Sequence, residues 1–222
     1  AVQKELRLDR QPRHIECFDN SNLQGAHPVA SCVVFRDGKP ARKEYRHFNI
    51  KTVEGPDDYA SMREVVFRRY SRLQEEGAEL PDLIIADGGK GQMGIIHEVL
   101  EYLGLDIPVA GLAKNDRHRT SELLCGYPPV LVGIRPTSPL FHFLAHIQEE
   151  VHRFAVSFHR QKRSKAFIHS ELEQIEGIGD KTIRTLLQHF RSVAKVKAAP
   201  AEELSALVGP AKAKKIRAFF EK

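Results

Sequence analysis

The chain of 222 residues contains no tryptophan, two methionines and three cysteines. The cysteines are odd in number and form no Cys-x-x-Cys pair, which argues against a disulfide framework and a zinc ribbon and fits a reducing compartment. We therefore expect Cys17, Cys32 and Cys125 to be small buried apolar residues. No uncharged apolar run approaches the ~20 residues that cross a bilayer, and the charged first ten residues do not resemble a signal peptide. These absences predict a cytoplasmic protein that neither crosses nor binds a membrane.

A strong charge of either sign is also missing, because 34 Lys and Arg face 29 Asp and Glu, a net charge of +5. The basic excess is confined to the last quarter of the chain. Residues 161–222 contain 13 basic and 7 acidic side chains, a net +6, whereas residues 1–160 contain 21 and 22, a net −1. A basic module on a nearly neutral body indicates a polyanionic partner, whose binding should weaken with salt.

Hydrophobic periodicity predicts the order of strands and helices. Three strands open the chain as an antiparallel meander, at His14–Phe18, Val29–Phe35 and Glu44–Lys51. The elements expected next are a helix at Asp57–Glu76, a buried strand at Pro81–Asp87, a helix at Gln92–Leu103, strands at Ile107–Ala113, Ser121–Cys125 and Pro129–Ile134, and a long helix at Ser138–Ala166. Strands that meet first through hairpins and later through crossovers predict an α/β fold, a ribonuclease H-like mixed sheet flanked by helices.

The last sixty residues differ in character, since short helices there are interrupted by glycines. We expect two domains, the α/β domain at 1–162 and a small all-α domain at 163–222. In the second domain, two turns repeat an order of apolar residues, glycine and lysine, and the residues of interest are Gly177, Gly179, Lys181, Gly209 and Lys212. Tandem turns of this kind form a double helix-hairpin-helix, which binds duplex or junction DNA through backbone phosphates without reading bases.

Two aspartates end predicted strands of the first domain. Asp19 follows the first strand, and Asp87 ends the buried strand at Pro81–Asp87. If these strands are neighbours, both carboxylates emerge at one edge of the sheet, where a divalent cation such as Mg²⁺ or Mn²⁺ is the usual reason to keep them together. Such an ion can activate water and stabilise an in-line phosphoryl displacement. The alternative is that each aspartate only makes local hydrogen bonds in a turn.

A glycine-rich turn, Gly88–Gln92, follows Asp87 and leads into a helix. Its backbone amides and Lys90 could hold a phosphate, although the spacing is not that of an ATP-binding P-loop. The alternative is a tight turn with an exposed lysine. Asp57 and Asp58 begin the preceding helix, where acidic residues are favourable at the positive end of the helix dipole, so local sequence alone does not give Asp58 a catalytic role.

The long helix contains four histidines, and a histidine facing the carboxylate edge could act as a metal ligand or general base. Its end is basic, with Arg160, Lys162 and Arg163 next to His159. These side chains could bind a phosphate backbone, or they could form a solvated face that favours a helix C-terminus. No His-Glu-x-x-His motif is present and no cysteine is near, so a zinc site is not expected.

The motifs together resemble the C-terminal half of the bacterial UvrC family over nearly the whole chain. The runs that carry the resemblance are Cys17–Asn22, Val29–Phe35, Asp57–Met62, Asp87–Gln92, His152, Phe158–Arg163 and the tandem hairpins. UvrC is the incision subunit of the UvrABC nucleotide excision repair nuclease. The resemblance implies a ribonuclease H-like endonuclease that cuts the damaged strand on the 5′ side of a lesion.

The resemblance also implies roles for single residues. Asp19, Asp87 and His159 look like a metal-binding triad, and Asp58 looks like a further catalytic acid. Lys114 and Arg117 match a substrate-binding stretch of the family, except that Asn115 stands at its glycine position. The family's N-terminal half and main UvrB-binding segment are absent, so we expect a C-terminal fragment that lacks the 3′ incision and most of the UvrB contact. We also expect a monomer whose partners are damaged double-stranded DNA and the UvrB–DNA complex. Two rival functions remain, another ribonuclease H-like nuclease (a junction resolvase or an inosine-directed enzyme) and a catalytically silent DNA-binding scaffold.

Overall fold

The computed structural model describes residues 1–21, 28–114 and 120–221, with side chains for all of these except 21, 114, 120, 121 and 159–170. The chain divides into two compact units, residues 1–158 and 159–222. The first unit contains α1 (Val2–Glu5), β1 (His14–Ser21), β2 (Val29–Arg36), β3 (Lys39–Pro40), a 3₁₀ turn (Arg42–Glu44), β4 (Arg46–Asn49), α2 (Asp58–Glu75), β5 (Leu83–Ala86), α3 (Lys90–Tyr102), β6 (Val109–Lys114), β7 (Thr120–Cys125) and β8 (Val130–Val132). It also contains the long helix α4 (Pro139–Glu173) as far as Phe158.

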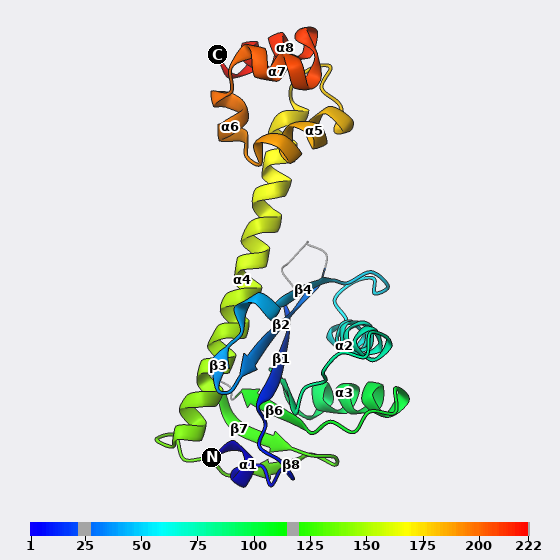
Figure 1. The fold of residues 1–222 in the computed structure, drawn as a ribbon, viewed down its shortest axis with the longest axis vertical. Coiled ribbons are helices and arrows are strands. Elements are labelled where there is room, and N and C mark those ends of the chain that lie inside the picture. Colours follow the sequence, from blue (N-terminus) through cyan, green and yellow to red (C-terminus); the bar gives the residue numbers. More distant parts are fainter. Residues whose placement is uncertain (22–27, 115–119, 222) are drawn as a thin grey trace. The chain divides into compact units, whose positions relative to one another are not determined.

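A mixed sheet forms the centre of the first unit (Figure 1). Its order is β3-β2-β1-β5-β6-β7-β8, and β4 also pairs with β2. The strands β1, β5 and β6 are parallel to one another, whereas β2, β3, β4, β7 and β8 pair antiparallel with their neighbours. This arrangement confirms the predicted mixed sheet, with a meander at one side and crossover connections in the middle.

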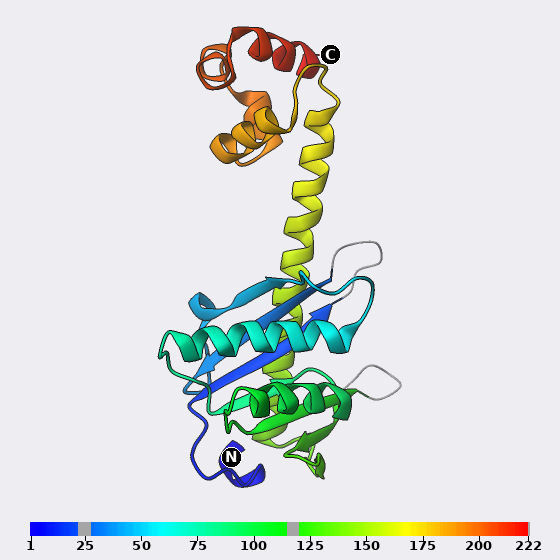
Figure 2. The ribbon, with the colours of Figure 1, turned by 90° about the vertical axis from the view of Figure 1, so that its right-hand side faces the viewer.

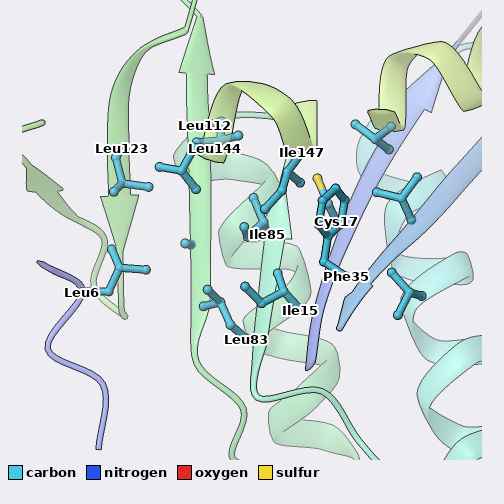
Figure 3. Close-up of a cluster of buried hydrophobic side chains, with 14 of the residues drawn as sticks. Leu6, Ile15, Cys17, Phe35, Leu83, Ile85, Leu112, Leu123, Leu144 and Ile147 are labelled. Atoms are coloured by element: carbon cyan, nitrogen blue, oxygen red, sulfur yellow. The ribbon is translucent and has the colours of Figure 1, made fainter. Parts of the chain in front are cut away.

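Helices cover both faces of this sheet, α2 and α3 on one face and α4 on the other (Figures 1 and 2). The face under α4 buries Ile15 and Cys17 of β1 against Leu144 and Ile147, as Figure 3 shows. The opposite face has a separate apolar core under α2 and α3, which includes Cys32. Cys17 and Cys32 are buried as predicted, and Cys125 is partly buried.

The N-terminus of α2 agrees with the sequence prediction, whereas one end of α3 and one end of α4 differ from it. The side chain of Asp57 accepts a hydrogen bond from the backbone N–H of Ala60 (2.9 Å), so Asp57 caps α2 and Asp58 is its first helical residue. Helix α3 begins at Lys90 rather than Gln92. Helix α4 extends to Glu173 rather than Ala166, because no glycine or proline follows Pro139 until Gly177.

A buried carboxylate in the middle of β1 attaches α2 to the sheet. Glu16 is fully buried and accepts hydrogen bonds from Tyr70 Oη (2.6 Å), from the guanidinium of Arg69 and from His14 Nε2 (3.1 Å). Burial alone would raise the pKa of Glu16. The hydrogen bonds and positive charge of Arg69, together with the hydrogen bonds from His14 and Tyr70, outweigh burial and lower this pKa to about 2. The carboxylate is therefore ionised inside the protein.

The second unit packs short helices around its own apolar core. After the end of α4 come α5 (Asp180–Phe190), α6 (Val193–Ala198), α7 (Ala201–Val208) and α8 (Pro210–Phe220). Gly177 and Gly209 have φ angles of +80° and +89°, which favour glycine at both hairpin turns. Lys212 Nζ donates to Thr182 Oγ1 (2.9 Å) and so links the second hairpin to the first. In the described part of the chain, no helix combines the length and apolar character needed to cross a membrane.

Candidate functional site

The two aspartates lie on neighbouring parallel strands, but only Asp87 follows a strand end. Strand β1 continues to Ser21, so Asp19 lies within the strand and not at its end as predicted. Phe18 of β1 is paired in register with Ala86 of β5, and the backbone N–H of Asp87 donates to the carbonyl oxygen of Phe18 (2.9 Å). Asp19 and Asp87 are therefore the next residues of two paired strands. The side chains two residues earlier, Cys17 and Ile85, both lie in the core under α4 (Figure 3). By the alternation of strand side chains, both aspartates belong to the face that α4 covers.

Helix α4 contacts this carboxylate pair through a residue that the sequence did not indicate. Gln148 Nε2 donates to Asp87 Oδ1 at 2.6 Å. His152 is exposed and follows one helical turn after Gln148, on the same side of the helix. The predicted metal ligand His159 lies in α4, but its side chain is outside the described residues.

The opposite flank of the edge is formed by the first turns of α2 and α3. Asn20 Nδ2 donates to the backbone oxygen of Asp58 (2.7 Å), which ties the N-terminus of α2 to the end of β1 one residue after Asp19. Lys90 is exposed in the first turn of α3, after the cap residue Gly89. The N-termini of two helices thus meet at the edge that carries the aspartates.

A cross-strand row extends the site toward α4. Asp19 is in register with Ser31 of β2, and Ser31 with His47 of β4. The ring of His47 stacks on Phe154 and Phe158 of α4, at centroid distances of 3.6 and 4.1 Å. These contacts fix the turns of α4 that flank His152. The sequence alone did not indicate that His47 lies near this row. Its place follows from the antiparallel register of β4 with β2, which only the structure gives.

The donor set fits a hard divalent cation. Asp19 is 9% exposed and supplies carboxylate oxygens beside those of Asp87, the ligands that Mg²⁺ and Mn²⁺ prefer. Among the side chains that the structure describes, no three His, Cys, Asp or Glu converge on one point. The described side chains therefore offer a carboxylate pair, and none of the described histidines converges on it as a third potential ligand.

The other predicted contacts fall into two groups. Arg117 and the side chains of Lys114, Arg160, Lys162 and Arg163 lie outside the described residues. The tail residues lie at the hairpins as expected: Gly177 and Gly179 in the turn before α5, Lys181 exposed in the first turn of α5, Gly209 between α7 and α8, and Lys212 in the first turn of α8. Their contact with DNA stays a prediction.

Comparison with known proteins identifies the family. A family model described as the UvrC RNase H endonuclease domain matches residues 3–156, and a SAM-like helix-hairpin-helix tandem matches residues 170–222. UvrABC system protein C of Bacteroides fragilis is 59% identical over 216 residues, which are 97% of this chain and 36% of the relative. The protein of the same name from Flavobacterium johnsoniae is 52% identical over 222 residues, 99% of this chain and 36% of the relative.

The chain thus spans about a third of the length of these curated relatives. Among solved structures, endonuclease V of Ciona intestinalis in complex with an inosine-containing DNA covers 60% of this chain and 79% of its own, at 12% identity and a TM-score of 0.38, a similarity too weak to carry a conclusion. The endonuclease model covers most of the chain, including all the strands of the mixed sheet. The chain therefore belongs to the UvrC family, as a ribonuclease H-like endonuclease domain followed by a helix-hairpin-helix tandem.

Proposed function

We propose that this chain is a divalent-metal-dependent DNA endonuclease of bacterial nucleotide excision repair, which makes the 5′ incision in the lesion-containing strand. The observation that supports this proposal most directly is the carboxylate pair Asp19 and Asp87, next to each other on parallel strands in a domain of the UvrC endonuclease family. Carboxylates in that position are suited to hold a cation beside a phosphodiester.

In this mechanism Asp19 and Asp87 hold Mg²⁺ or Mn²⁺, and Gln148 orients Asp87 through its hydrogen bond to Oδ1. The ion, when bound, supplies an activated water and positive charge for an in-line displacement at phosphorus. The buried position of Asp19 and the bond of Gln148 to Asp87 preset the ligand geometry. Asp58, held at the same edge by Asn20, is the proposed additional catalytic acid.

The hairpin tail would hold the duplex through its turns, while basic residues of the first domain and of the α4 end bind the strand that is cut. The proposed contacts are Lys90, Lys114, Arg117, Arg160, Lys162, Arg163, Gly177, Gly179, Lys181, Gly209 and Lys212. Because hairpins of this type bind phosphates, the tail contributes affinity without base specificity. We further propose a cytoplasmic monomer that acts on the UvrB–DNA complex.

Cleavage of a lesion-containing bubble substrate tests the function as a whole. We expect the chain to nick the lesion strand on its 5′ side in Mn²⁺ or Mg²⁺ and to be inactive in EDTA. Four-way junctions and inosine-containing duplexes serve as comparison substrates and should be cut more slowly. Binding without nicking in any metal would favour a silent scaffold, and faster cutting of a junction or of inosine DNA would favour another nuclease of this fold.

The identity of the metal-site histidine is a separate prediction. The family resemblance places it at His159, whereas helix geometry places His152 one turn from the residue that contacts Asp87. We propose that His159 completes the site. His152 is the alternative, because it lies nearer to Asp87 along α4, although its described side chain does not converge with the two carboxylates. Replacing the histidine that completes the site by alanine should reduce nicking by about 100-fold or more, the loss expected when a metal ligand or general base is removed.

The two variants His152→Ala and His159→Ala are compared in the same assay, with DNA affinity measured in EDTA. The variant that lacks the metal-binding histidine should also need more Mn²⁺ for half-maximal nicking. The other variant should retain the wild-type Mn²⁺ requirement. If both variants nick at the wild-type rate, neither histidine belongs to the site.

A further inference from the structure

The exposed tyrosine at the start of α2 has an unusual position. Tyr59 is the second residue of α2 and 54% exposed. The other exposed aromatic residues of the described chain have ring partners: Phe67 and Tyr102 contact each other, and Tyr127 stacks on His97. No ring partner of Tyr59 occurs within the described residues.

Tyr59 is held over the backbone of α3. A β-carbon built on Gly91 would lie 2.4 Å from Tyr59 Oη and 2.7 Å from Cε1, so the ring occupies the space in which any larger residue 91 would have its side chain. The backbone of α2 at this point is fixed as well, because Asp57 caps the helix and Asn20 donates to the carbonyl oxygen of Asp58. The ring is therefore both well positioned and open to solvent.

Tyr59 is close in the fold to the edge of the sheet that carries Asp19 and Asp87. Asn20 follows Asp19 directly, and Gly91 comes four residues after Asp87. The Tyr59 ring thus lies over the first turn of α3, which follows Asp87 after the turn at residues 88–89, next to the N-terminus of α2. Tyr59 belongs to the flank formed by α2 and α3, and the carboxylates to the face under α4. A DNA strand that crosses this edge with a phosphate at Asp19 and Asp87 would therefore bring a neighbouring base toward the ring.

We propose that Tyr59 is a stacking platform for an unpaired base of the DNA strand that is led to the carboxylate pair. The proposal rests on the endonuclease function proposed above and specifies how that site binds its substrate strand. Base–aromatic stacking is independent of sequence, which suits an enzyme that cuts next to varied lesions. The ring would fix the register of the strand relative to Asp19 and Asp87, and Gly91 keeps the space that the ring needs.

Affinity for DNA in EDTA tests the platform without cleavage. The probe is a bubble duplex with an unpaired thymine-rich strand, and the variants are Tyr59→Leu, which keeps the bulk but loses the aromatic ring, and Tyr59→Phe, which restores it. We expect Tyr59→Leu to weaken binding about 5- to 100-fold, the range for loss of one base–aromatic stack, and Tyr59→Phe to bind as wild type. Tyr102→Leu is the matched control, since Tyr102 is an exposed tyrosine at the far end of α3, and its affinity should not change.

Photocross-linking gives a readout that a merely structural role would not produce. With 5-iodouracil at single unpaired positions, the cross-linked peptide from the wild-type protein should contain Tyr59, and this holds even if Tyr59→Leu fails to fold. Cross-links that map only elsewhere, or equal loss of affinity in Tyr59→Leu and Tyr102→Leu, would overturn the proposal. A protein that cross-links at Tyr59 but never nicks in Mn²⁺ would instead refute the endonuclease function and leave the stacking platform in place.

Discussion

Replacing Asp19 or Asp87 by asparagine is expected to reduce metal-dependent DNA cleavage by about 100- to 1,000-fold, since a bound cation contributes several kcal/mol to the transition state. Asparagine keeps the shape of aspartate but removes the negative charge that binds the ion. Asp19 lies within β1 and Asp87 directly after the neighbouring strand β5, so each substitution removes one of the two proposed ligands. Single-turnover nicking of a lesion bubble over a range of Mn²⁺ concentrations measures the effect.

DNA binding should separate this effect from a loss of structure. Neither aspartate belongs to the hairpin unit, so affinity in EDTA should not fall, and removing a negative charge near the phosphates should raise it slightly. Asp37→Asn is a matched control, because Asp37 is an exposed turn residue after β2, at the end of the sheet opposite to Asp19. Nicking by Asp19→Asn at the rate of Asp37→Asn would show that the carboxylate pair is not the metal site.

Local patterns predicted the parts of the fold whose signals are local. The apolar run ending at Asp87 and the polar stop after Phe18 predicted two neighbouring strand ends. The pairing of Phe18 with Ala86 confirms that the two strands are neighbours, but β1 continues to Ser21, because its last residues still pair with β2. The glycines at 177 and 209 predicted two hairpin turns because both turns need positive φ angles. In each of these places, backbone conformation and solvent exposure are decided by a few adjacent residues.

The parts that could not be predicted depend on residues far apart in sequence. Gln148 reaches Asp87 across 61 residues, and nothing in its helix distinguishes it from a solvent-facing glutamine. Tyr59 reads as an ordinary amphipathic helix residue until the close approach of Gly91 is seen. Glu16 interrupts the apolar run between Ile15 and Cys17, and its partners Arg69 and Tyr70 lie more than fifty residues later on α2.

Breaking the buried network of Glu16 is expected to have the largest effect on stability. Glu16→Gln leaves Arg69 largely buried opposite a neutral amide, and breaking a buried ion pair by removing one partner costs about 3–5 kcal/mol. The matched control is Glu44→Gln, which removes the partly exposed ion pair with Arg36 and should cost no more than about 1 kcal/mol. Urea denaturation at pH 7 compares the two variants, and equal losses would show that the Glu16 network adds no special stability.

The same carboxylate gives the protein a defined sensitivity to acid. The pKa of Glu16 is about 2 in the folded chain against an ordinary value of 4.5, so the unfolded chain binds its proton first as the pH falls. The stabilisation is therefore complete above pH 4.5 and is lost as the pH falls toward 2, by up to about 3 kcal/mol. Unfolding free energies measured between pH 6 and pH 3 should fall less steeply for Glu16→Gln than for wild type. Glu16 is on the same strand as Asp19 and contacts the helix that begins with Asp58, so an equal slope in both proteins would mean that α2 is attached to β1 by packing alone.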